Sequence, residues 1–162
     1  MQAQNIDEVI AYLDQIITTE VSKGSKLVYF PILYRKVTQA IKVAIEQGEF
    51  EDNPRMEVFD VVFANKYIKA YQDWKDGKKV PISWQSTFDV RNQKLTTLQH
   101  LVIGMNAHIN FDLGIAAATV APKEKIYDLK ADFDEINVIL NKLVNNITER
   151  RSAISKASRP RR

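Results

Sequence analysis

The sequence predicts an all-α fold, a single-domain bundle of five or six helices around one central buried helix. In every long segment, apolar residues recur at the three- and four-residue spacing of a helix. No segment shows the sustained alternation of apolar and polar residues that is typical of a strand. A chain of 162 residues with 45% hydrophobic and 27% charged content and no internal repeat suits one domain with one core.

Two helices are expected before residue 50. Asn5 followed by Glu8 is typical of a capping box, so the first helix begins there and ends at Gly24. The second helix runs from about residue 30 to 47 and ends at Gly48. Each helix has one apolar face, formed by Ile6, Val9, Ile10, Leu13, Ile17 and Val21 in the first and by Leu33, Val37, Ile41, Ala44 and Ile45 in the second.

The third helix has the clearest start signal in the sequence. Asn53 is expected to be its N-cap and Pro54 its first residue, because proline is tolerated where a backbone N–H has no partner. The helix is expected to end near Gly77. Three polar side chains follow the edge of its apolar face, namely Asp60, Tyr67 and Tyr71.

The remaining helices include the central one. Ser83 is expected to cap a short helix that buries Trp84 and Phe88, and the last helix is expected over about residues 128–150. Residues 95–121 form the central helix, which is apolar on two opposite sides and is therefore expected to be enclosed by its neighbours. One side holds Leu98, Val102, Met105, Ile109 and Leu113, and the other holds Ile103, Ala107 and Phe111.

His108 and Asp112 are the polar residues of the central helix that most need an explanation, because they lie one turn apart on the same face. A carboxylate beside an imidazole orients the ring and raises its pKa, which suits a general base in hydrolase-like catalysis. Alternatively, His108, Asp112 and Asp60 hold a divalent metal such as Mg²⁺, Mn²⁺ or Zn²⁺. The candidate ligand-binding residues around the pair are Asn106, Asn110, Tyr67 and Tyr71.

The same cluster also has a purely structural interpretation. Buried polar side chains that hydrogen-bond to one another fix the register of packed helices, and such networks are common. The chain is then a non-enzymatic scaffold or partner-binding protein. A small-molecule or metal site needs a water-accessible pocket that reaches His108, whereas a packing network predicts a sealed ring bonded only to protein. The sequence leaves both alternatives open, and with them the identity of any small-molecule or protein partner.

Composition limits the kinds of site that the chain can hold and predicts where it is located. There is no cysteine, so disulfides and thiolate metal sites are excluded. A signal peptide is not recognisable, and no run reaches the roughly 18 apolar residues of a membrane span, which predicts a cytoplasmic location. Residues 149–162 hold six basic and one acidic side chain, so the chain divides into a helical domain, 1–148, and a basic tail, 149–162. Such a tail can bind nucleic acid, although a solvated terminus is the simpler interpretation.

The central stretch resembles a known protein family. The run GMNAHINFDL, residues 104–113, preceded by LQHL at 98–101, is similar to the signature of the uncharacterised helical family DUF5995. The approach to it is similar as well, with Pro81, Trp84 and Phe88 after a helix that holds Asp60 and Tyr71. The resemblance spans roughly residues 55–120. It implies an all-α fold, and it brings no established activity, cofactor or ligand.

Overall fold

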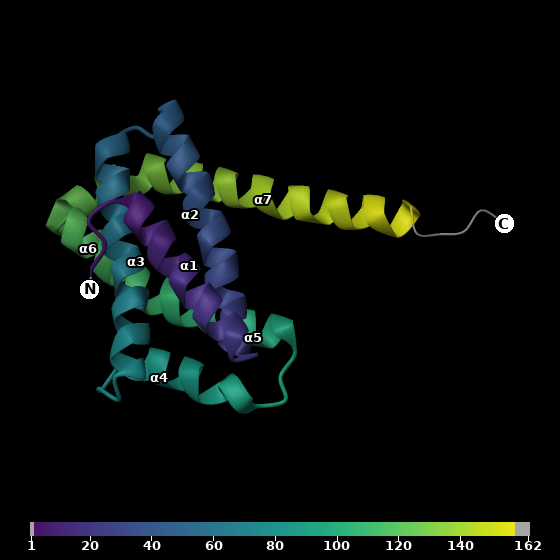
Figure 1. The fold of residues 1–162 in the computed structure, drawn as a ribbon. Helices are drawn as coiled ribbons and strands as arrows, with labels where there is room; N and C mark the ends of the chain where they lie inside the picture. Colours follow the sequence, from purple (N-terminus) through teal and green to yellow (C-terminus); the bar gives the residue numbers. More distant parts are fainter. Residues whose placement is uncertain (1, 158–162) are drawn as a thin grey trace.

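Helices form nearly all of the computed structural model, which describes the backbone of residues 2–157 and the side chains of residues 2–143 (Figure 1). The all-α prediction is confirmed, and no strand occurs in this part of the chain. Because α5, η3 and α6 run on as one continuous helix, the described residues contain six helices besides short 3₁₀ turns. Their bounds are α1 Ile6–Ser22, α2 Tyr29–Gln47, α3 Asn53–Lys75, α4 Ile82–Asp89, α5 Thr97–Ala107, η3 His108–Asp112, α6 Leu113–Val120 and α7 Lys130–Ala157.

Local capping explains where most helices begin and end. The side chain of Asn5 accepts the Glu8 N–H at the start of α1, as predicted. Gly48 ends α2 with φ of 72°, a left-handed conformation that costs glycine little. At α3 the structure corrects the N-cap to Asp52, whose side chain accepts the Arg55 N–H.

Neither Asn53 nor Ser83 caps a helix as expected. Asn53 is the first residue of α3, and its side chain instead bonds the backbone of Phe50 in both directions. Ser83 lies inside α4, which begins at Ile82 without a side-chain cap. The start of α5 is marked by a capping box in which Thr96 and Gln99 bond each other reciprocally, so α4 and α5 are separate helices.

The core consists of two packed clusters of buried side chains. One lies among α1–α5 and is rich in aromatic rings, with Phe30, Tyr67, Trp84 and Phe88 at its centre. The other joins α2 and α3 to α6 and α7 and includes Met56, Phe59, Phe63, Leu129 and Ile139. The α5–η3–α6 helix borders both clusters, because Ala107 belongs to the first and Ala116 and Ala117 to the second.

The structure corrects the expectation that neighbours enclose the α5–η3–α6 helix. Its inner side packs on α2, α3 and α4, but the large apolar residues of its outer side are 41–68% exposed. Periodicity identifies residues that share a face, and it does not tell whether a second element covers that face. The outer residues are Leu98, Val102, Met105, Ile109, Phe111 and Ile115.

This helix also has the length and composition of a membrane span, although it holds no uninterrupted apolar run of about 18 residues. Residues Thr97–Val120 reach a mean hydropathy of 1.3 over 18 residues, of which 33% are buried. Core helices of folded domains meet the same criterion.

The last helix, α7, extends from the body as an isolated rod beyond the other helices (Figure 1). It begins at Lys130, after a 3₁₀ segment at Lys123–Leu129, and it continues to Ala157. The predicted basic tail, 149–162, has side chains outside the described residues, so the domain boundary at residue 148 stays a prediction.

Candidate functional site

His108 and Asp112 delimit a single π-helical turn, η3, inside the α5–α6 helix. Its signature is the Leu113 N–H, which donates to the carbonyl oxygen of His108 five residues earlier. At the roughly 100° per residue of an unbroken α-helix, Phe111 and Ile115 would share a face with His108. The extra residue of the π turn rotates the following segment. In the structure Phe111 and Ile115 are exposed, and Asp112 is buried beside His108.

The inward pair forms a hydrogen-bonded network with α4. His108 Nδ1 lies 3.1 Å from Asp112 Oδ2, and the indole Nε1–H of Trp84 donates to the same oxygen at 2.9 Å. Because a carboxylate only accepts, Nδ1 carries the proton and Nε2 presents a lone pair. Burial lowers the pKa of His108, and the bond to Asp112 opposes that shift. The network is therefore built around a neutral imidazole.

Aromatic rings surround this imidazole. Phe63 stacks on it almost in parallel, with ring centroids 3.7 Å apart and an interplanar angle of 6°. Tyr34 lies 4.5 Å away and Phe30 5.6 Å away, both edge-on. His108 is only 2% exposed, so solvent does not reach it. The structure thus has the sealed ring expected of a packing network.

A small cavity shares walls with this site. About 10 Å³ in volume, it is lined partly by Phe30, Tyr67 and Trp84, all of which also lie near the His108 ring. His100 and Lys26 line it too. This volume is near the minimum that one water molecule needs, so it is too small for a substrate.

Asp60, the predicted third metal ligand, is buried on α3. Its Oδ2 atom has no partner within the described residues, and burial, together with the charge of Glu57, raises its pKa to about 7. Among the side chains of residues 2–143, no group of three or more His, Cys, Asp or Glu is arranged to hold a metal ion. The metal set of His108, Asp112 and Asp60 therefore stays a prediction without a matching ligand geometry.

Tyr34 is another buried polar residue of this region. Its hydroxyl is buried and unpartnered among the described residues. Burial raises its pKa well above the usual 10, and the negative charges of Asp60 and Asp112 add to that shift. His108 Nε2 is unpartnered in the same way, so α2, α3 and η3 each bury one polar atom without a bond in this region.

The predicted ligand-binding residues are not gathered at the pair. Asn106 and Asn110 are exposed and hydrogen-bond to each other on the outer side of the helix. Tyr67 lies in the aromatic wall, 6.4 Å from the His108 ring. The Tyr71 hydroxyl instead donates to the buried Glu20 of α1 at 2.5 Å.

Three residues in contact with the pair were not predicted as site residues, namely Tyr34, Phe63 and Trp84. A buried tryptophan needs an acceptor for its N–H, which was the one available signal for Trp84. Tyr34 and Phe63 come from helices whose packing against η3 no sequence spacing indicates.

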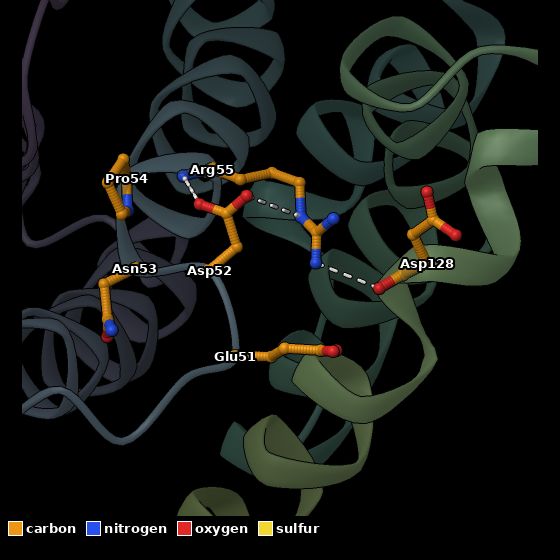
Figure 2. A pocket seen from close by; sticks show the side chains of 6 residues that line it. All are labelled: Glu51, Asp52, Asn53, Pro54, Arg55 and Asp128. Carbon is orange, nitrogen blue, oxygen red and sulfur yellow. Dashed lines mark hydrogen bonds and ion pairs between the residues drawn. The ribbon is translucent and has the colours of Figure 1, made fainter.

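A larger cleft, about 440 Å³, lies at the surface where the α2–α3 loop meets the start of α7 (Figure 2). Arg55 Nη2 donates to the carbonyl oxygen of Asp128 at 2.9 Å and to the carboxylate of the buried Asp132 at 2.6 Å. The second oxygen of Asp132 accepts the Glu51 N–H at 2.8 Å. These bonds from Arg55 and Glu51 to Asp128 and Asp132 fasten the start of α7 to α3, so the cleft is a junction between the two helices.

Comparison with known proteins gives one match. The family model described as "Family of unknown function (DUF5995)" covers residues 6–161, which extends the resemblance from the central stretch to nearly the whole chain. Neither the curated proteins nor the solved structures contain a match. The sealed His108–Asp112 pair therefore lies within the region that the family model covers, and this all-helical chain belongs to the DUF5995 family.

Proposed function

We propose that this chain is a non-enzymatic, partner-binding helical protein that docks through the outer side of the α5–η3–α6 helix. The observation that carries the proposal is the apolar stripe, which we define as Leu98, Val102, Met105, Ile109, Phe111 and Ile115. All six are large apolar side chains with 41–68% of their surface exposed.

The size of the apolar stripe supports a docking role. Each of these side chains exposes on the order of 100 Å², about 600 Å² in total, on two flanks of the helix with Asn110 between Ile109 and Phe111. An exposed apolar area of this size is at the upper end of the range for monomeric proteins, and such areas are often binding sites. Methionine and phenylalanine, both present here, are enriched in protein interfaces.

The buried network supports the same function indirectly. Without the π turn, Phe111 and Ile115 would face the interior with His108, and the apolar stripe would end near Ile109. The bonds from His108 and Trp84 to Asp112 hold that carboxylate inside and so stabilise the rotated register. In this proposal the buried polar cluster stabilises the helix register that exposes Phe111 and Ile115 at the docking surface.

Site-specific photocrosslinking tests the docking role. A benzoylphenylalanine at Val102 is expected to form a discrete adduct in the cells that produce this chain. The same probe at Val58, which is also about half exposed but lies on α3, is the matched control. An adduct at both positions, or at neither, overturns the proposal.

A second candidate function rests on the three buried, unpartnered atoms Tyr34 Oη, Asp60 Oδ2 and His108 Nε2. Leaving such groups unsatisfied costs about 1–3 kcal/mol each, so a small polar molecule that bonds them would be favoured. There, His108 Nε2 would accept a hydrogen bond from a molecule of about the size of water, while Asp112 orients the ring. Asp60 would donate from its protonated form.

Elemental analysis and native mass spectrometry of the purified chain test this candidate. A stoichiometric metal or small molecule that is lost in both His108→Ala and Asp112→Ala would favour it over the docking function. The bare polypeptide mass in the wild type, together with reduced stability of both variants, would favour the packing network.

A further inference from the structure

We infer that a cleft beside the turn between α1 and α2 binds the phosphate group of a small organic phosphate monoester. The cleft measures about 420 Å³, a volume typical of small-molecule sites and larger than inorganic phosphate alone needs. It lies among the end of α1, the 3₁₀ turn η1 (Lys26–Val28), the end of α3 and the 3₁₀ turn η2 (Val90–Asn92). None of these elements carries the apolar stripe, so the inference is independent of the proposed docking function.

Arg91 is the residue of this cleft that points most directly to an anionic ligand. The structure describes the side chains of three arginines, and two of them, Arg35 and Arg55, bind a carboxylate. Arg91 has no carboxylate partner among the described residues. Its Cζ lies 5.2 Å from the ring centroid of Trp74, and its Nη1 donates to the carbonyl oxygen of Phe88 at 3.2 Å. These contacts hold the guanidinium in place and leave N–H donors for two oxygens of one phosphate group.

Lys26 supplies a second fixed cation to the same cleft. Its Nζ donates to the backbone carbonyl oxygens of Gln93 and Leu95, both at 3.3 Å. Because a carbonyl oxygen carries only a partial charge, these bonds position the ammonium group without neutralising it. An ammonium group has three N–H donors, so one remains for a ligand. Two cations are therefore held ready for an anion without a carboxylate between them.

The cleft also contains one carboxylate, Glu20, whose charge is already compensated. Burial raises the pKa of Glu20, but hydrogen bonds from three neighbours outweigh burial and lower it from 4.5, so the group is charged near pH 7. Those neighbours are Ser25, Tyr71 and Lys23, and Lys23 Nζ lies 3.1 Å from the carboxylate. Three cations and one carboxylate line the cleft, which leaves a net charge of +2. A phosphate monoester carries a charge of about −1.5 to −2 at this pH, which complements it.

The charge of the rest of the chain favours a small ligand over nucleic acid. Residues 1–148 carry 17 basic and 19 acidic side chains, a balance of −2, which repels a long polyanion. A monoester concentrates its charge at one point within the cleft. The Trp74 ring and the Asn92 amide also line the cleft, and they offer an apolar contact and hydrogen-bonding groups to the organic part of the ligand.

Titration of the full, nitrogen-15-labelled chain with ribose 5-phosphate, followed by NMR, tests the inference. The indole N–H signal of Trp74, in the cleft, is expected to shift with a Kd below about 1 mM. The indole N–H signal of Trp84, which is enclosed and bonded to Asp112, is the internal control and is expected to stay unchanged. Ribose without phosphate is expected to shift neither signal.

Variants of the two fixed cations locate the binding. Arg91→Gln is expected to weaken binding of ribose 5-phosphate at least tenfold, and Lys26→Gln at least about threefold. Lys36→Gln removes an equal charge from an exposed position on α2 outside the cleft, and is expected to change the affinity less than about twofold. Circular dichroism establishes that the variants are folded.

Three results would overturn the inference. The first is an unshifted Trp74 signal at about 10 mM ribose 5-phosphate, and the second is binding of ribose as tight as that of its phosphate. The third is binding by Arg91→Gln and Lys26→Gln as tight as by Lys36→Gln. Tighter binding of a single-stranded RNA of about 10 nucleotides, with the same dependence on Arg91, would also overturn it, in favour of nucleic acid.

Discussion

The imidazole of His108 is buried, and within the part of the chain that the structure describes only its Nδ1 has a hydrogen-bond partner. Because burial lowers its pKa below the usual 6.5, the neutral ring is the resident form near pH 7. Its contribution to stability then comes from packing against Phe63 and Tyr34 and from the bond to Asp112. Both contributions can be measured through the free energy of unfolding.

We expect His108→Ala to lower the free energy of unfolding by about 3–5 kcal/mol, because it leaves a cavity among the rings and removes a partner of Asp112. Urea denaturation measures this loss. Asn110→Ala, two residues along the same helix but exposed on the outer side, is the control and is expected to change stability by about 0.5 kcal/mol at most. Equal effects of the two substitutions would contradict the packing role.

Asp60 provides a prediction about pH. Its pKa rises from 3.8 in the unfolded chain to about 7 in the fold, so between these values the native state binds more protons than the unfolded state. Stability therefore falls as pH rises from about 4 to 7, by up to about 4 kcal/mol from this group alone. Asp60→Asn removes the effect.

The pH dependence of the wild type must be compared with that of Asp60→Asn, because the titration of His108 changes stability in the opposite direction. Its lowered pKa means that the unfolded chain takes up a proton below pH 6.5, and stability from this group is lost as pH falls. Subtracting the variant's unfolding free energy from that of the wild type at each pH cancels the His108 contribution. A difference that does not change between pH 4 and 7 would show that the Asp60 pKa is unshifted.

At the residue scale, the sequence predicted the contact between His108 and Asp112 for a local reason. His108 and Asp112 are four residues apart, and that spacing brings them together on one helix. The partners that decide their environment, Tyr34, Phe63 and Trp84, lie on three other helices. Contacts between helices depend on how the helices pack, which the spacing of residues within each helix does not encode.

At the element scale, helix identity was predictable and the π turn was not. The apolar periodicity and the caps at Asn5 and Gly48 located helices to within a few residues. Continuing the regular periodicity through residues 104–115 places Phe111 inside, as expected before the structure, yet Phe111 is exposed. A π turn leaves no signal in the sequence, because whether it forms here depends on the hydrogen-bond partners that Asp112 finds in the fold.

The α5–η3–α6 helix offers a matched pair of glycines for a prediction. A Cβ at Gly104 would lie 2.8 Å from the Phe30 ring, whereas a Cβ at Gly114 would meet open space. Gly104→Ala is therefore expected to lower the free energy of unfolding by about 1–3 kcal/mol. Gly114→Ala is expected to raise it by about 0.5–1 kcal/mol, because alanine is the better helix former.

Thermal and urea unfolding of the two glycine variants provide the measurement. The same substitution in the same helix must act with opposite signs. If both variants gain stability, Phe30 does not approach the backbone of α5 as closely as the structure indicates.

At the scale of the whole molecule, the sequence predicted the number of helices but not which faces they cover. The pattern of residues 95–121 is that of a helix with two apolar sides, and the fold covers only one of them. A helix face that a partner would cover and a helix face that the chain's own helices cover have the same periodicity. Only the arrangement of α2, α3 and α4 on one side distinguishes the two cases.

The junction between α3 and α7 is a further feature of the whole molecule. Asp132 is fully buried, and its two oxygens bind Arg55 and the Glu51 N–H. Asp132→Ala leaves both donors without this acceptor and is expected to lower the free energy of unfolding by about 3–5 kcal/mol. Asp134→Ala, which removes an exposed ion pair with Lys130, is expected to cost less than about 0.5 kcal/mol.

Hydrogen exchange along α7 checks the location of this effect. Exchange is expected to rise at the start of α7 in Asp132→Ala and to stay unchanged in Asp134→Ala. A uniform rise throughout the chain in both variants would mean that the junction does not hold α7 separately.

The burial of Trp84 gives the molecule an optical reporter. The chain has two tryptophans, of which Trp84 is completely enclosed and bonded to Asp112, while Trp74 is partly exposed beneath Arg91. Iodide in solution can quench the fluorescence of Trp74 but does not reach Trp84. The unquenched, blue-shifted emission therefore belongs to the ring beside His108, and it should disappear whenever that interior admits water.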